Sequence, residues 1–324
     1  MKNVARAMTI VGMFIGSGFA SGKEIAVFFS RFGSYSYIFI PVAFLLIFGG
    51  IFWILSQGRR GEEKFKSSKL LIFISCLVNL IFTASMMAGT TTSLKTKYIS
   101  LSALLVLAMF FLCQRVMKKG MGYLTKANLI LMPLVIVSLV CCLIKNAGSE
   151  CLINSNNAVY AGFYAVLYIF MNMSSSCLVI GKIGAEISRK ERFFISLISS
   201  LILITLLFGI NYTLLTNEGT IDASLPLLEI SSGFIYYLMK FVLFAGCLTS
   251  LLSVVFINSQ SFKQLGVGKI WSYILCILFP FGISLFGFGN IVTHLYPLAS
   301  ILGGVILFSL YFLPTLKKRN MQRF

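Results

Sequence analysis

The most informative part of this chain is the stretch Gly12-Met-Phe-Ile-Gly-Ser-Gly-Phe-Ala-Ser-Gly-Lys-Glu24. It lies inside an apolar segment, residues 6–30, that is long enough to cross a bilayer at about 1.5 Å per residue. Each glycine in a helix interior costs roughly 1 kcal/mol relative to alanine. The stretch holds four of them, Gly12, Gly16, Gly18 and Gly22. We therefore expect a helix that is broken within the membrane.

A broken helix is tolerated at membrane depth only where it faces protein or a water-filled cavity. The pattern predicts a discontinuous helix whose freed backbone binds a solute or an ion. The polar residues Ser17, Ser21, Lys23 and Glu24 favour this interpretation. The alternative is close helix packing, because small residues four positions apart also let helices touch.

Composition places the chain among helical membrane proteins. Of its 324 residues, 58% are hydrophobic and only 11% are charged, which predicts an all-α polytopic membrane protein. The net charge of +18 does not indicate nucleic-acid binding, because the basic residues lie in short loops between apolar spans. Eight cysteines without C-x-x-C spacing and a single histidine, His294, indicate no metal cluster or disulfide framework.

The hydropathy pattern predicts ten transmembrane helices joined by short connections, and therefore a single transmembrane domain. The spans are 6–30, 34–57, 69–91, 98–117, 125–145, 157–187, 193–216, 233–262, 268–287 and 289–314. Basic residues gather at the amino terminus, at the carboxyl tail and in every second loop, whereas the opposite loops carry Glu150, Glu218, Asp222 and Glu229. This asymmetry predicts that both termini are cytoplasmic.

Ten spans divide into two halves of five, residues 1–150 and 151–324. An odd number of spans in each half predicts an inverted repeat, with interrupted helices at corresponding places. The sixth span, 157–187, contains Asn172 and the run Ser174, Ser175 and Ser176, followed by Lys182 and Glu186. Serines favour non-helical backbone by bonding to it, so we expect helix 6 to be discontinuous like helix 1. Hydrogen bonding between intact helices is the alternative for these serines.

The eighth span carries a stripe of small and polar residues. Gly246, Thr249, Ser250 and Ser253 follow the spacing i, i+3, i+4 and i+7 and so share one helical face. Such a face can point hydroxyl oxygens at a hard cation, and it can equally serve close packing.

At these residues the chain resembles a known group. The stretch 11–24, followed by Phe28, Phe29 and Gly33, resembles the opening of the YkvI family of bacterial membrane proteins, which show a G-x-G-F-A-S-G-x-E stretch there. That family is similar to the amino acid–polyamine–organocation transporter superfamily with its LeuT-like five-plus-five inverted repeat. The resemblance implies a bacterial cytoplasmic membrane location.

The resemblance also implies two sites. A sodium site would use carbonyls of Gly12 and Ile15, with Gly246, Thr249 and Ser250 from the eighth span. A solute would meet the backbone N–H groups of Ser17, Gly18 and Phe19, and the side chains of Asn172, Ser174, Ser175 and Ser176. Further functional positions would flank the two breaks, namely Gly16, Gly22, Lys23, Glu24, Lys182 and Glu186.

One departure concerns Lys23 and Glu24, since many amino-acid carriers are apolar at this position. The pair leaves the type of solute open. Some proton-coupled relatives place a lysine of the fifth span where sodium would sit, but here Lys126 and Lys145 stand only at the ends of that span.

These observations predict a secondary active transporter of an amino acid or related carboxylate. It would work by alternating access with sodium, rather than a proton, as the coupling ion, and with no other cofactor. Its predicted partners are the small solute and the bilayer, while protein partners stay open. The alternative is a ligand-sensing membrane receptor subunit on the same fold, similar to germinant receptor subunits. An enzyme is not expected, because the chain has neither H-E-x-x-H nor G-x-S-x-G.

Overall fold

The structure is a computed structural model that describes residues 2–93, 121–148 and 157–312. All regular elements in these ranges are helical, as predicted. The elements are α1 (Lys2–Phe14), α2 (Ser17–Ser21), α3 (Lys23–Phe28), η1 (Ser30–Phe32), α4 (Tyr35–Ser67), α5 (Lys69–Ser93), α7 (Met121–Asn146), α8 (Ala158–Gly184), α9 (Arg189–Leu215), η2 (Glu218–Thr220), α10 (Pro226–Ile230), α11 (Gly233–Gln264), α12 (Lys269–Ser284), α13 (Phe288–Asn290), the π-helical η3 (Ile291–Leu295) and α14 (Tyr296–Phe312).

Seven helices of the described residues are long and apolar enough to cross a membrane. They correspond to the predicted spans that begin at 34, 69, 125, 157, 193, 233 and 289. The predicted first span appears instead as the short helices α1, α2 and α3, and the ninth contains the shorter apolar helix 274–284. The predicted span 98–117 lies outside the described residues. The count of ten and the inverted repeat therefore stay predictions.

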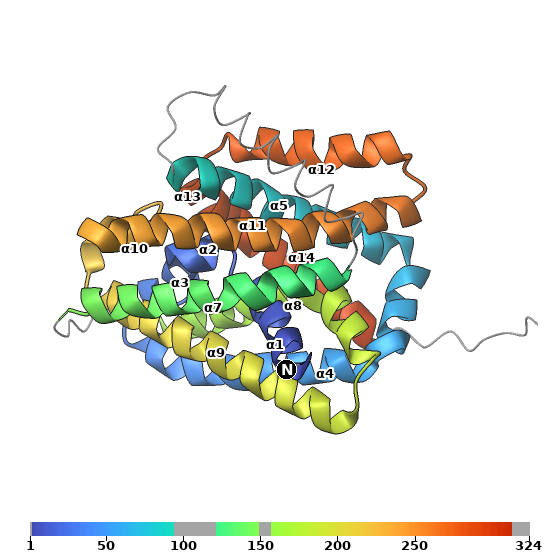
Figure 1. Cartoon of the computed structure of the whole chain (residues 1–324), viewed down its shortest axis with the longest axis horizontal. Helices are drawn as coiled ribbons and strands as arrows, with labels where there is room; N and C mark the ends of the chain where they lie inside the picture. The colour runs from blue at the N-terminus through green and yellow to red at the C-terminus, as the bar shows by residue number, and fades with distance from the viewer. Residues whose placement is uncertain (1, 94–120, 149–156, 313–324) are drawn as a thin grey trace, which may run out of the picture.

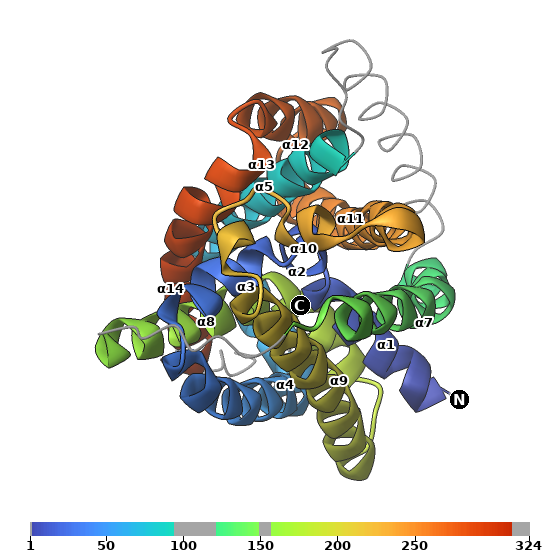
Figure 2. The same cartoon turned by 90° about the vertical axis from the view of Figure 1, so that its left-hand side faces the viewer.

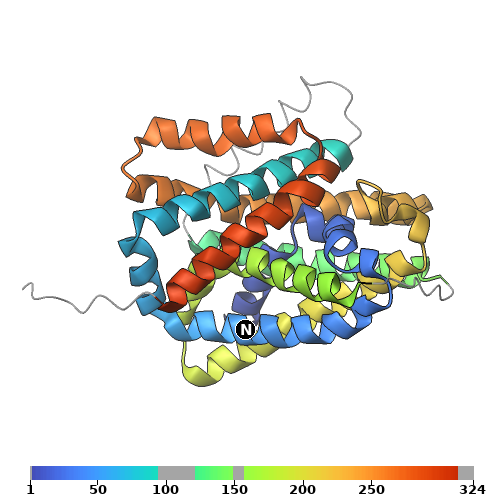
Figure 3. The same ribbon diagram turned by 180° about the vertical axis from the view of Figure 1, so that it is seen from behind.

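The interrupted first segment lies at the centre of the molecule. Figure 1 shows the long helices running along the longest axis, and the view from the end in Figure 2 shows them arranged around α2 and α3, while α1 runs outward beside α7 and α9. Nearly every residue from Ala7 to Ser30 is buried. From behind, α14 crosses the other long helices obliquely, while α12 lies at the outer edge beside α5 (Figure 3). A buried segment with broken helices is thus enclosed by protein rather than exposed to lipid, as the backbone requires.

The predicted interruption of the sixth span is wrong in this structure. Residues 158–184 form one continuous helix, α8. The hydroxyl of Ser174 donates to the carbonyl of Met171, and those of Ser175 and Ser176 donate to the carbonyl of Asn172. Serine hydroxyls that bond three or four residues back satisfy themselves without leaving the helix. Of the two predicted discontinuous helices, only helix 1 is discontinuous.

Candidate functional site

The first interruption lies between α1 and α2, at Ile15 and Gly16. The N–H of Gly16 donates to the carbonyl of Phe14 at 3.0 Å, instead of reaching back to the carbonyl of Gly12 as a continuing helix would. The carbonyl of Gly12 is therefore free to meet another element. The hydroxyl oxygen of Ser250, on α11, lies 3.1 Å from the carbonyl oxygens of both Gly12 and Ile15.

Four of the five residues predicted for a sodium site come together here. Gly12, Ile15 and Ser250 are joined by the contacts just described, and Gly246 lies one turn before Ser250 on the same face of α11. A Cβ atom added at Gly246 would stand 3.5 Å from the carbonyl oxygen of Ile15, so the two backbones approach closely. The fifth residue, Thr249, is on α11, but its side chain lies outside the described residues.

The second interruption is at Gly22, between α2 and α3. Gly22 has φ +80°, a left-handed conformation that strains any residue with a Cβ atom. The hydroxyl of Ser21 donates to the carbonyl of Gly18 at 3.0 Å and accepts from the N–H of Lys23 at 3.2 Å. Gly22 also lets α10 pack closely, because an added Cβ atom would lie 2.9 Å from Cγ of Leu227. Ser21 and Gly22 thus fix the turn that aims α3.

Lys23, at the start of α3, extends toward the segment between α9 and α11. Its Nζ donates to the carbonyl of Asp222 at 2.9 Å and to that of Ile221 at 3.4 Å. The residue is only 5% exposed, although it carries a cation. Lys23 thereby joins the interrupted helix to the segment containing η2 and α10.

Glu24, the next residue, points the other way, into the protein. It is 3% exposed, and its Oε1 accepts a hydrogen bond of 3.1 Å from Nδ2 of Asn172 on α8. Asn172 is held in place because the same amide group donates to the carbonyl of Tyr168 at 3.1 Å. The two predicted site residues Glu24 and Asn172, 148 positions apart in the chain, therefore form a direct contact between helix 1 and helix 6.

The other carboxylate oxygen of Glu24 lies over the backbone of Gly18. A Cβ atom added at Gly18 would stand 2.5 Å from Oε2 of Glu24 and 3.3 Å from Cε2 of Tyr296. Gly18 is therefore required here for its lack of a side chain. The carboxylate occupies the space that any larger residue on α2 would fill.

A chain of hydroxyl groups lies beside Glu24. The hydroxyl of Ser17 lies 3.3 Å from that of Ser85 on α5, and Ser85 forms a very short hydrogen bond with the hydroxyl of Tyr296. The hydroxyl of Tyr168 is buried and has no hydrogen-bond partner among the described residues. The ring of Tyr296 lies beside the same position of Gly18 as Oε2 of Glu24, and the ring of Tyr168 packs against Phe28 and Phe29 at the end of α3.

Sequence reasoning did not identify Ser85, Tyr168 or Tyr296. A single serine within an apolar span and tyrosines among many aromatic residues are typical of ordinary helix packing. Only the pairing of elements distant in sequence brings them to Glu24.

The other residues predicted to bind solute have mixed surroundings. The backbone bonds of α2 begin with the N–H of Ala20 donating to the carbonyl of Gly16, so Ser17, Gly18 and Phe19 supply the N–H groups of its first turn. Ser174 faces α14, since an added Cβ atom at Gly303 would stand 2.5 Å from its hydroxyl oxygen. The solute-binding roles of these residues stay predictions.

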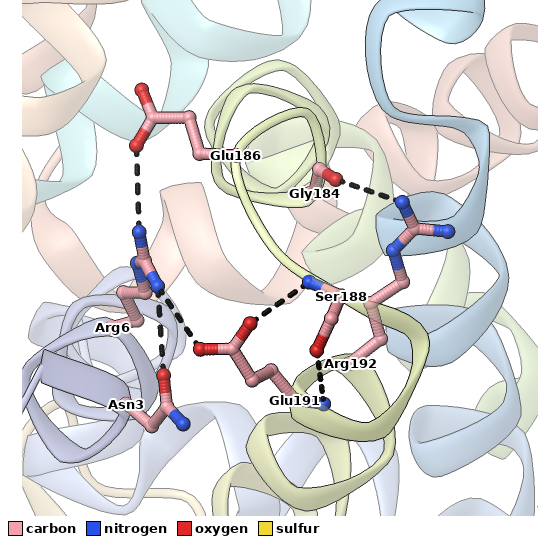
Figure 4. A network of polar contacts seen from close by, with 7 residues as sticks. All are labelled: Asn3, Arg6, Gly184, Glu186, Ser188, Glu191 and Arg192. Atoms are coloured by element: carbon pink, nitrogen blue, oxygen red, sulfur yellow. Dashed lines mark hydrogen bonds and ion pairs between the residues drawn. The ribbon is translucent and has the colours of Figure 1, made fainter.

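A polar network lies at the opposite end of α1. Figure 4 shows the guanidinium of Arg6 between Glu186 and Glu191, at 3.6 and 3.7 Å. Glu191 also accepts from the N–H of Ser188, and its own N–H donates to the Ser188 hydroxyl, which caps the start of α9. The start of α1 thus lies beside the α8–α9 connection, while the cytoplasmic location of the termini stays a prediction. Lys182 lies near them and donates to Oε1 of Gln260 at 3.0 Å.

Comparison with known sequences gives one distant relative. No family model matches the chain. A protein of Bacillus subtilis (strain 168) described as the uncharacterized membrane protein YkvI is 22% identical, in an alignment that covers 90% of this chain and 90% of the relative. The chain is therefore similar to a bacterial membrane protein.

Comparison with solved structures shows a fold shared with two transporters. A manganese transporter of Eremococcus coleocola, in complex with an aromatic bis-isothiourea substituted compound, has a TM-score of 0.59 at 14% identity and is matched over 95% of this chain and 77% of its own. Mhp1, a nucleobase-cation-symport-1 family transporter in a closed conformation with bromovinylhydantoin bound, has a TM-score of 0.59 at 11% identity, over 94% and 77%. At these identities the likeness shows the fold alone.

Proposed function

We propose that this protein is a secondary active transporter that moves a small organic solute across the membrane by alternating access. The observation that carries the proposal is the meeting of Ser250 with the freed carbonyls of Gly12 and Ile15. Irregular backbone at membrane depth is costly unless it serves a buried site. In transporters with broken helices, such unwound carbonyls coordinate the coupling ion.

Sodium is the coupling ion of this proposal. The carbonyl oxygens of Gly12 and Ile15 and the hydroxyl oxygen of Ser250 offer hard oxygen ligands within one small volume. These atoms come from α1 and α11, two elements whose relative position changes if one group of helices rocks against the rest. An ion held between them would favour one arrangement over the other and so link ion binding to the conformational change.

The solute of this proposal is an amino acid or related carboxylate, bound next to the sodium ion. Its carboxylate would accept from the N–H groups of Ser17, Gly18 and Phe19, which carry the partial positive charge of a helix start. Asn172 is placed at the same break by its bond to Glu24. The solute's other polar group would lie toward α8.

The test compares the thermal stability of the purified wild-type protein with that of the double variant Thr249→Ala/Ser250→Ala. A ligand that binds the folded state raises the apparent stability by mass action. We expect sodium, compared with potassium at equal ionic strength, to stabilise the wild type and to permit stabilisation by amino acids or organic acids. The double variant should lose the response to sodium.

The matched control is Ser300→Ala. Ser300 is buried like Ser250, but its hydroxyl donates to the carbonyl of Tyr296 within α14. This control should keep the sodium response. An unchanged sodium response in the double variant would exclude the sodium site. Solute binding without uptake into vesicles would point to a sensor instead of a carrier.

A further inference from the structure

The buried carboxyl group of Glu24 is the strongest feature that the proposed sodium site does not use. Among the carboxylates that the structure describes, Glu24 is the only buried one, since the others lie at exposed or half-exposed positions. Neither of the ion pairs found in the described ranges includes it. A buried carboxylate normally needs a cation or several strong hydrogen bonds to offset its lost hydration.

The neighbouring cations do not supply that compensation. Lys23 directs its Nζ to the carbonyls of Ile221 and Asp222. Arg31, on η1, is exposed and stacks on the ring of Tyr164 at 5.1 Å. His294, on η3, is also exposed. The elements packed against α3 therefore bring no positive side chain to Glu24 within the described residues.

The remaining groups around Glu24 are neutral. Asn172 on α8 gives its Oε1 one hydrogen bond, and its Oε2 lies over the backbone of Gly18. The titratable groups near Glu24 are the phenols of Tyr168, on α8, and of Tyr296, at the start of α14. On α9, which also contacts α3, Tyr212 donates to the carbonyl of Gly148, and Glu191 lies in the network around Arg6. An ionised Glu24 would thus stand among neutral groups with a single hydrogen bond.

We propose that Glu24 is a proton-binding site, which holds its proton while the molecule is closed around it and gives it up when water reaches the site. A bound proton removes the charge that burial makes costly, and it does so without the several oxygen ligands that a metal cation needs. The buried Tyr168 hydroxyl has no hydrogen-bond partner among the described residues, and its oxygen is an acceptor to which a protonated carboxyl group could donate.

The proton balance of this step is simple. On opening, the O–H bond of the Glu24 carboxyl group breaks, the proton passes to water, and the hydrated carboxylate remains. On closing, the carboxylate must take a proton back from the water on the side to which it is then open. The role of this proton in a transport cycle rests on the proposed function. The presence of the proton on Glu24 does not depend on that function.

The test is infrared spectroscopy of the full-length protein, purified in a detergent without ester groups. A protonated carboxylic acid has a carbonyl stretch that a carboxylate lacks. We expect this band in the wild type at neutral pH and its loss in Glu24→Gln. The control Glu186→Gln should keep the band, because the Glu186 side chain is 72% exposed and faces Arg6.

A second variant tests the position of the group without removing it. Asn172→Leu deletes the hydrogen bond to Oε1, so the band should stay but move to higher frequency. Gln is neutral and close in shape to protonated glutamic acid, so Glu24→Gln should unfold at a temperature close to that of the wild type. If Glu24→Gln does not fold, the presence of the band in the wild type and its shift in Asn172→Leu still test whether Glu24 is protonated.

Absence of the band from the wild type at neutral pH, or its persistence in Glu24→Gln, would overturn the proposal. Neither measurement needs a solute or sodium. A missing band would therefore remove the proton site and leave the sodium-coupled carrier standing. If the band is present but sodium does not stabilise the protein, the proton site on Glu24 stands and the sodium-coupled carrier is excluded.

Discussion

Two glycines of the first segment are required for different physical reasons. Gly22 is required for its backbone, because φ +80° is strained for any residue with a Cβ atom. Gly18 is required for its space, because the carboxylate of Glu24 and the ring of Tyr296 lie where a side chain would start. At Gly16 an added Cβ atom would come 3.3 Å from Cε of Met86, the end of a flexible side chain that can move.

We expect Gly22→Ala to destabilise the protein by about 1–2 kcal/mol, the usual cost of a left-handed conformation for an L-residue. The added methyl group would also press on Leu227, and so loosen α10. Thermal or denaturant unfolding of the purified protein measures the change. Gly219→Ala is the control, because Gly219 is exposed and has open space around its Cα. Equal stability of the two variants would contradict this account of Gly22.

At the scale of elements, Lys23 joins the interrupted helix to the segment 217–230. Its Nζ bonds to two carbonyls there, and α10 packs on Gly22 from the same side. Hydrogen bonds from a charged donor contribute roughly 1.5–3 kcal/mol. This single side chain therefore contributes much of what holds the segment over the break.

We expect Lys23→Met, which keeps the length but removes the charge, to let the segment 217–230 open more often. A loss of about 1.4 kcal/mol corresponds to a tenfold rise in the open population. Hydrogen exchange of this segment should accelerate by about that factor. Lys240→Met is the control, because Lys240 lies over the ring of Tyr236 at 4.7 Å and does not contact the segment through Ile221 or Asp222. Unchanged exchange in Lys23→Met would show that packing alone holds the segment.

At the scale of the whole molecule, the central segment is fastened at both ends. Arg6 ties α1 to the α8–α9 connection, while Lys23 ties α3 to the segment after α9. Because α9 runs from one of these connections to the other, the two fastenings lie at opposite ends of the helix bundle. A molecule that opens alternately at its two ends would have to break the contacts of Arg6 for one opening and those of Lys23 for the other.

We expect Arg6→Gln to favour opening at the end where Arg6 lies. Exposed ion pairs contribute only about 0–1 kcal/mol each, so the shift in the closed-to-open ratio should be at most a few fold per pair. Distances between spin labels at the exposed positions Lys2 and Lys190, on a cysteine-free background, report it. The distribution should broaden toward longer distances in Arg6→Gln but not in Lys23→Met. The same distribution in wild type and Arg6→Gln would exclude a fastening role for this network.

Local sequence patterns were sufficient to predict the helical membrane class and the position of the break in the first segment. Long apolar runs need helices to satisfy their backbone in lipid, and repeated glycines weaken a helix wherever it folds. Both effects are local. Local patterns also gave one wrong prediction, the interruption of the sixth span. Its serines form their hydrogen bonds equally well within the continuous helix α8.

The identity of the groups that meet at the break depends on the packing of distant helices and could not be predicted from local patterns. Asn172 reaches Glu24, Ser250 reaches the carbonyls of Gly12 and Ile15, and the hydroxyls of Ser85 and Tyr296 join beside them. Each contact joins residues far apart in the chain, so no local periodicity encodes it. The burial of Glu24, which has no cation beside it in the part of the chain that the structure describes, likewise arises from the surrounding helices, because dehydration of a charge depends on everything packed around it.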